Sequence, residues 1–107
     1  MEKIKLISVR NEEYPEGRWD RFTIKPVLEL IDPITNLFKD LGFSVDVLND
    51  LDMYYPKFGG FKSFYSKKIK AYLIGYEEDC LEIVLDSNLP RIKIVEVVER
   101  YFQFPEE

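Results

Sequence analysis

The sequence predicts a small α+β domain, with a mainly antiparallel sheet and two helices packed on one of its faces. Three observations support this fold class. Two segments repeat apolar residues at helical spacing, and several short segments alternate apolar and polar residues as strands do. The connections between the later strands are short, which favours antiparallel neighbours. A chain of 107 residues is expected to form one globular domain, 1–107, around a single core.

The N-terminal part is predicted to be a strand followed by a loop. Residues 3–10 alternate, with Leu6 on one face and Ile7 and Val9 on the other. Residues 11–20 contain a proline, a glycine and five charged side chains. This composition is typical of a loop.

Residues 24–41 carry the clearest helical period in the chain. Pro26 suits the first turn of a helix, and Gly42 suits the position just after the last turn. Pro33 lies within the pattern, where it either kinks the helix or allows Asp32 to cap a second one. The apolar stripe is unbroken, which favours one kinked helix. The stripe consists of Val27, Leu30, Ile31, Ile34, Leu37, Phe38 and Leu41.

The rest of the chain is divided by alternation and turn signals into three strands and a second helix. The final segment has many β-branched residues, which favour strands, but the adjacent pair Val97-Val98 breaks a period of two and favours a helix. The expected order is therefore β-α-β-β-β-α. The expected elements are strands over 43–48, 67–75 and 80–86, an irregular segment over 49–66, a hairpin turn over 76–79 and a helix over 90–103.

The composition excludes several classes of chemistry. There is no histidine and only one cysteine, Cys80, so imidazole-dependent nucleophiles and structural zinc sites are not expected. The aspartates of 46–52 lack the spacing, the glycine and the closing glutamate of a calcium loop. No cofactor motif, secretory signal or membrane span is present in the sequence. We therefore expect a cytoplasmic protein that is not an enzyme and holds no cofactor or metal.

Charge is distributed unevenly along the chain. Residues 1–53 carry 7 basic and 11 acidic side chains, and residues 75–107 carry 3 basic and 9 acidic ones. Residues 54–74 carry five lysines and no acid, although the whole chain has a net charge of −5. This basic segment is also rich in aromatic residues. We expect its phenylalanines at 58, 61 and 64 to lie in the core, and Trp19 to cover the core as well, although both could instead contact a partner.

An acidic protein without catalytic groups is typical of a binding protein. The sequence therefore predicts a small inhibitor of the immunity-protein or antitoxin kind, which neutralises a basic, nuclease-like toxin by blocking its active site or substrate groove. Acidic clusters would attract the partner, and tyrosines would anchor it. The predicted partner-binding residues are Asp46, Asp50, Asp52, Tyr54, Tyr55, Glu77, Glu78 and Asp79.

Other functions stay open at this point. The basic aromatic segment 54–70 could bind single-stranded nucleic acid through phosphate contacts and base stacking, although the net negative charge opposes this. The chain could also be a non-catalytic regulatory subunit, or a small enzyme that uses paired carboxylates. The sequence does not determine the oligomeric state.

Overall fold

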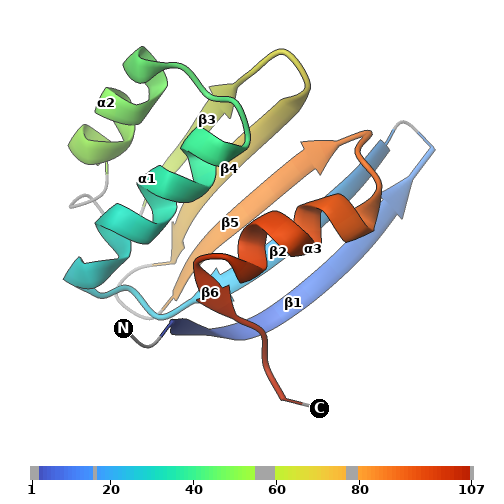
Figure 1. Cartoon of the computed structure of the whole chain (residues 1–107), viewed down its shortest axis with the longest axis horizontal. Coiled ribbons are helices and arrows are strands. Elements are labelled where there is room, and N and C mark those ends of the chain that lie inside the picture. Colours follow the sequence, from blue (N-terminus) through green and yellow to red (C-terminus); the bar gives the residue numbers. More distant parts are fainter. Residues whose placement is uncertain (1–2, 16, 55–59, 77–79, 107) are drawn as a thin grey trace.

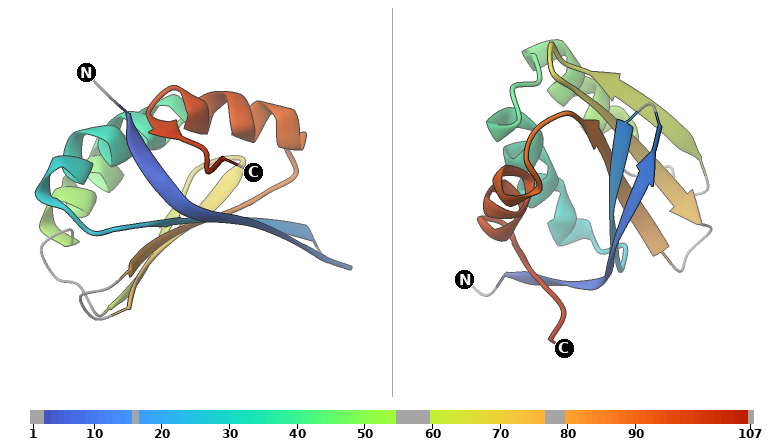
Figure 2. Two further views of the ribbon diagram at one scale, coloured as in Figure 1. Left: turned by 90° about the horizontal axis from the view of Figure 1, so that it is seen from below. Right: turned by 90° about the vertical axis from the view of Figure 1, so that its right-hand side faces the viewer.

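A six-stranded mixed sheet forms one layer of the molecule in the computed structural model, and three α-helices cover one face of it (Figures 1 and 2). The structure describes residues 3–15, 17–54, 60–76 and 80–106, and every count below refers to them. The α+β class and the helices on a single face are confirmed. The expected order and the number of helices are wrong in detail.

The strand order in the sheet is β3-β4-β5-β2-β1-β6. All neighbours are antiparallel except β1 and β6, which are parallel. The elements are β1 (Ile4–Tyr14), β2 (Gly17–Ile24), a single 3-10 turn η1 (Leu28–Leu30), α1 (Ile31–Asp40), α2 (Val45–Tyr54), β3 (Phe61–Tyr65), β4 (Ile69–Tyr76), β5 (Cys80–Ser87), α3 (Arg91–Glu99) and β6 (Phe102–Gln103).

The segment 11–20, predicted to be a loop, instead forms most of a long β-hairpin. Tyr14 pairs with Gly17, so both strands are paired up to these two residues. Some of the charges that indicated a loop are paired within the sheet. Arg18 donates to the almost fully buried Asp20 carboxylate on the same strand (3.2 Å), and Glu12 pairs with Arg21 on the neighbouring strand. Composition alone predicted the wrong structure here because charged side chains can pair within a sheet as well as be solvated in a loop.

A β-bulge in β1 changes which side chains reach the core. The pairing with β2 is irregular between Leu6 and Ser8, which leaves Ile7 without a direct partner on β2. The extra residue shifts the alternation, so Leu6 and Val9 both pack on the helix side while Ile7 is exposed. The expectation that Val9 lies on the face opposite Leu6 is therefore wrong.

The predicted helix over 24–41 is confirmed in its centre and stripe. Ile34, Leu37 and Phe38 are buried. The kink expected at Pro33 is not present, because α1 begins at Ile31 and Pro33 lies in its first turn, where no backbone hydrogen bond is lost. The residues before α1 form η1. Gly42 follows α1 with φ +92°, a conformation that glycine adopts without strain.

The strand predicted over 43–48 is instead the start of α2. The Ser44 hydroxyl accepts from the backbone N–H of Val47 (3.4 Å), and its carbonyl accepts from Leu48 (3.1 Å), as at a helix N-cap. Val47, Leu48, Leu51 and Tyr54 recur at helical spacing and pack on the core. The alternation over residues 43–48 indicated a strand, but the helical period of apolar residues continues from Val47 to Tyr54 and determines the structure.

The C-terminal half follows the predictions closely. β4 and β5 are antiparallel, as expected, and β3 extends the sheet within the segment predicted to be irregular. In α3, Ile94 and Val98 are buried, four residues apart, which confirms a helix in this segment. The chain leaves the helix sooner than expected, since Phe102 is buried as part of β6, which pairs with Ile4 and Lys5.

The ends of α1 and α3 are joined by a small polar cluster. The Asp40 carboxylate accepts from the Arg100 guanidinium (3.1 Å) and from the Tyr101 hydroxyl (2.5 Å). The hydrogen bond from Tyr101, together with the charge of Arg100, lowers the pKa of Asp40, while the same hydrogen bond raises the pKa of Tyr101.

Replacing Leu37 with alanine should cost about 2–5 kcal/mol of unfolding free energy, because its side chain is completely buried under α1. Urea denaturation followed by circular dichroism measures this. Ile92 on α3 is the control, since its side chain is 65% exposed and Ile92→Ala should change stability by less than about 0.5 kcal/mol. Similar losses for both variants would contradict this description of the core.

Replacing Tyr101 with phenylalanine should raise the pKa of Asp40 toward its ordinary value of 3.8, because the strongest stabilising hydrogen bond is lost. A lowered pKa stabilises the fold above 3.8 and loses that contribution as the pH falls through the folded-state value. The stability difference between the two proteins should therefore shrink at acidic pH. Carboxyl NMR titration measures the pKa, with Tyr65→Phe as the control; an unchanged Asp40 value would contradict the assignment.

Candidate functional site: the open face of the sheet

The face of the sheet opposite the helices is not covered by any described element (Figure 2). Strand register arranges its side chains in cross-strand rows, and every second residue of each strand belongs to it. Three rows cross the sheet: Glu12, Trp19, Asp86, Lys70 and Tyr65; Arg10, Arg21, Val84, Tyr72 and Ser63; and Ser8, Thr23, Glu82, Ile74 and Phe61.

Four aromatic rings follow one another across this face, and we call them the aromatic line: Tyr14, Trp19, Tyr72 and Phe61. Tyr14 meets Trp19 edge-on (5.2 Å between ring centroids), Trp19 lies 5.9 Å from Tyr72, and Tyr72 stacks on Phe61 at 5.5 Å. Offset and edge-on pairs at these distances are favourable. The line spans from β1 to β3, so it covers most of the width of the sheet.

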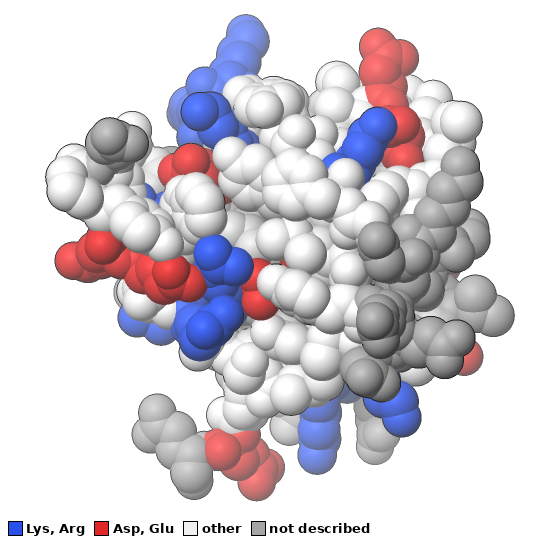
Figure 3. Space-filling view, turned by 180° about the vertical axis from the view of Figure 1, so that it is seen from behind, with Lys and Arg blue, Asp and Glu red and all other residues white. Residues whose placement is uncertain are grey.

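The aromatic line and its neighbours form a small apolar layer on the open face. Val84, which stands between Arg21 and Tyr72 in its row, is only 1% exposed although no helix covers it. At the same time Phe61 is 62% exposed, and Tyr65, four residues further along β3, is similarly exposed. Figure 3 views the molecule from this side and shows a largely uncharged middle. Contiguous exposed aromatic surface of this kind is typical of an interaction site.

Four charged residues beside the aromatic line neutralise one another, and we call them the ion network: Arg10, Glu12, Arg21 and Glu82. Arg21 donates to Glu82 (2.6 Å) and also pairs with Glu12, and Arg10 lies 3.8 Å from Glu82. The Glu82 side chain is only 4% exposed, so its buried negative charge is stabilised by these two arginines rather than by solvent. The Arg21 guanidinium also lies over the Trp19 ring, 5.2 Å from its centroid.

The ion network is joined to the aromatic line by a hydrogen bond at the hairpin end. The Tyr14 hydroxyl donates to the Glu12 carboxylate (2.5 Å). This bond, assisted by the charge of Arg21, lowers the pKa of Glu12, and it raises the pKa of Tyr14. For Arg21, burial alone would lower its pKa, but the hydrogen bond and charge of Glu82 outweigh burial, and its pKa is raised. The site thus carries fixed charges of both signs.

The predicted acidic residues of 46–52 do not follow a strand, and they lie in the helix layer. Asp46 and Asp52 are exposed on α2, and Asp50 pairs with Lys62 on β3 (3.1 Å). Tyr54 packs against the core, where its hydroxyl donates to the Leu73 carbonyl (3.3 Å) and burial raises its pKa. Both the ring and the hydroxyl of Tyr54 therefore make contacts within the chain, which leaves little of this side chain for a partner.

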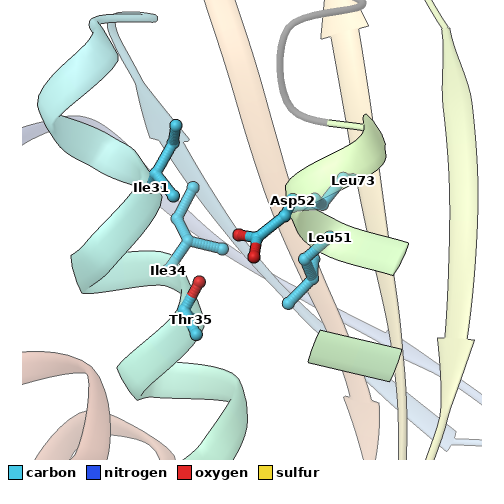
Figure 4. Close-up of a pocket in the computed structure, with 6 residues that line it drawn as sticks. All are labelled: Ile31, Ile34, Thr35, Leu51, Asp52 and Leu73. Atoms are coloured by element: carbon cyan, nitrogen blue, oxygen red, sulfur yellow. The ribbon is translucent and has the colours of Figure 1, made fainter. Parts of the chain in front are cut away.

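The other predicted partner-binding residues, Tyr55, Glu77, Glu78 and Asp79, lie outside the described residues. Asp52 can be followed in Figure 4, where its carboxylate points from α2 toward Thr35 on α1. The gap between these helices has no room for a water molecule. It is a packing seam between α1 and α2, and it offers no space to a ligand.

Trp19 and Phe61 belong to the site, although the sequence indicated core positions for both. Phe64 is buried in the core as expected, whereas Phe61 points to the open face, and Phe58 is outside the described residues. A signal for Trp19 was present in the sequence. Within 21–24 the apolar Phe22 and Ile24 alternate with Arg21 and Thr23, which is the pattern of a strand with one covered face and places Trp19 on the other face.

The described residues contain no group of three or more acidic or cysteine side chains placed to hold a metal ion. Among the same residues, no helix has the length and apolarity needed to cross a membrane. Comparison with protein-family models, with curated proteins and with solved structures finds no match to this chain.

Replacing Arg21 with methionine should cost about 3 kcal/mol of unfolding free energy, because it leaves the buried Glu82 charge with only the distant Arg10. Adding Glu82→Leu to this variant should restore part of the lost stability, since the buried and unpaired negative charge is then removed. Arg10→Met is the control, and this exposed residue should contribute at most about 1 kcal/mol. Urea denaturation of the four proteins gives the comparison. A double variant less stable than Arg21→Met alone would show that Glu82 does not depend on Arg21.

Proposed function

We propose that this chain is a non-catalytic protein-binding domain that docks a protein partner on the open face of its sheet. The observation that carries the proposal is the aromatic line, which crosses an uncovered face and ends at the highly exposed Phe61. Tryptophan, tyrosine and arginine are the residues most often responsible for binding energy at protein interfaces. All three types occur side by side on this face.

The arrangement supports binding of a folded surface because the site is pre-organised. The rings of Trp19 and Tyr72 are held by their neighbours, and the Arg21 side chain is fixed by two carboxylates. Little side-chain freedom remains to be lost when a partner docks, which favours affinity. An open sheet face also suits a protein surface better than a small molecule, which needs a concave pocket.

The helix layer provides a reason to propose a basic partner. Five aspartates lie on α1 and α2 against one lysine, Lys39, and the chain has a net charge of −5. Such a field accelerates the approach of a cationic protein without requiring direct contact. We therefore keep the proposal of an inhibitor of the immunity-protein or antitoxin kind, acting on a basic, nuclease-like toxin. In this arrangement the aromatic line supplies contact, and the net negative charge of the chain supplies attraction.

Single-stranded nucleic acid is the alternative occupant of the same face. Exposed aromatic rings stack on bases, and Lys70 stands directly opposite the exposed Tyr65, with Lys67 and Lys68 in the turn between β3 and β4. Against this, the three basic side chains in the cross-strand rows are matched by three acidic ones. A surface without net positive charge attracts phosphates weakly. The observations favour a protein.

A photo-crosslinking residue placed at position 61 should capture a protein in cells of the natural host. Position 92 on α3 is a matched control, because Ile92 is an apolar residue of nearly equal exposure (65% against 62%) on the opposite layer. A nuclease-resistant adduct from position 61 and none from position 92 is the expected result. A nuclease-sensitive adduct would instead identify nucleic acid, and equal capture from both positions would contradict the open face as the site.

With the captured partner purified, surface-binding kinetics should separate contact from attraction. Phe61→Ser should accelerate dissociation at least about tenfold, as for an interface anchor, while Ile92→Ser leaves it unchanged. Reversing Asp46 and Asp52 to lysine should slow association several-fold, with an effect that diminishes as salt rises above about 0.15 M. Association that responds neither to these reversals nor to salt would contradict a basic partner, although the protein-binding function would stand.

A further inference from the structure

The outer edge of β1 is unpaired over most of its length. β6 pairs with β1 only at Ile4 and Lys5, and no other described strand lies beyond residues 7–14 (Figure 1). This free stretch is longer than β3, the five-residue strand at the other edge of the sheet. Unpaired backbone N–H and C=O groups along an edge form a template for another strand.

The register of the hairpin determines which backbone groups point outward. Tyr14 and Gly17 face each other across a two-residue turn, so they form a hydrogen-bonded pair, and such pairs alternate along the strands. Tyr14, and every second residue before it in β1, therefore directs its backbone groups to β2. The residues between them, Val9, Asn11 and Glu13, direct theirs to the free edge.

We propose that this edge pairs with the same edge of a second copy of the chain, antiparallel and centred on Asn11. In that register the outward groups of Val9 meet those of Glu13 of the second copy, and Asn11 meets itself. Arg10 then stands opposite Glu12 of the second copy, twice, with opposite charges side by side. Arg10 is available for this contact, since its side chain is 62% exposed and its ion pair with Glu82 is long, at 3.8 Å.

The charges of Arg10 and Glu12 favour the register centred on Asn11 over the registers centred on residues 10 and 12. Sliding the copies so that the symmetry axis passes through residue 10 places Arg10 opposite itself. Sliding the other way places Glu12 opposite itself. Like charges directly opposite each other destabilise antiparallel pairs, so both neighbouring registers are disfavoured. The sequence of β1 is therefore complementary to itself in one register, which is the property that a symmetric dimer requires.

The two sheets then form one continuous sheet with both open faces on the same side. The aromatic line of each copy begins at Tyr14, close to the shared edge, so the dimer presents two docking surfaces side by side. An edge-to-edge contact buries little area, so we expect association in the micromolar range. This inference does not depend on the proposed function, because it rests on the backbone edge of β1 and the charges of Arg10 and Glu12 and not on the aromatic line.

Sedimentation velocity of the full chain over roughly 5 to 200 μM should show a reversible monomer–dimer equilibrium. Asn11→Pro removes an outward N–H without breaking a bond to β2 and should abolish the dimer. Arg10→Glu alone and Glu12→Arg alone should each give monomers, because like charges then face each other. Mixing these two variants should restore a dimer, since every facing pair is then of opposite sign. Circular dichroism confirms that each variant is folded.

A monomer at the highest concentration, or a dimer that Asn11→Pro leaves intact, would overturn the proposal. Failure of the mixed variants to pair while each remains folded would also overturn it, because the register predicts their complementarity. The position-61 crosslinking experiment is independent of these outcomes, so failure of one idea can be distinguished from failure of the other.

Discussion

Arg21 is the residue on which the open face depends. It stands on β2, near the middle of the sheet, and its neighbours Phe22 and Asp20 on the same strand are buried on the helix side. Its guanidinium neutralises the buried Glu82, pairs with Glu12 and lies over the ring of Trp19. A planar group with five donors can serve all three neighbours at once, which a lysine cannot do. The aromatic line therefore lies beside charged side chains that are paired with one another.

This arrangement explains how a sheet can leave one face open and still be ordered there. The open face keeps its own small apolar layer, in which Val84 is buried between Arg21 and Tyr72. The aromatic rings and the ion network support each other, because Tyr14 donates to Glu12 and the Arg21 guanidinium lies over the Trp19 ring. A pre-formed surface of this kind is suited to recognition, whereas the packing seam between α1 and α2 offers no room for a ligand. This geometry supports our proposal that the domain binds a protein partner.

Prediction from the sequence succeeded where the period of apolar residues was long and unbroken. The stripe of α1, the β4–β5 pair and the start of α3 were all found in this way. It failed over 11–20, where many charged residues indicate a loop but the chain forms a β-hairpin. It also failed over 43–48, where a short alternation indicates a strand but the longer helical period up to Tyr54 gives α2. For the site, the sequence predicts mainly acidic residues, because charged residue types can be identified from the sequence alone. Trp19 and Phe61 were taken for core because large aromatic side chains usually lie there.

The sequence by itself determined the α+β class, the helical stripe that covers one face of the sheet, and the absence of the histidine and cysteine sets that many catalytic and metal sites require. The tertiary structure decided which aromatic residues are buried and which are presented. Phe61 and Phe64 are three residues apart in one strand, yet they belong to opposite faces, because side chains alternate across the sheet and only one face has helices over it. The ion network joins residues that are 61 positions apart in the chain, Arg21 and Glu82, and such pairs exist only after the strands have taken their register.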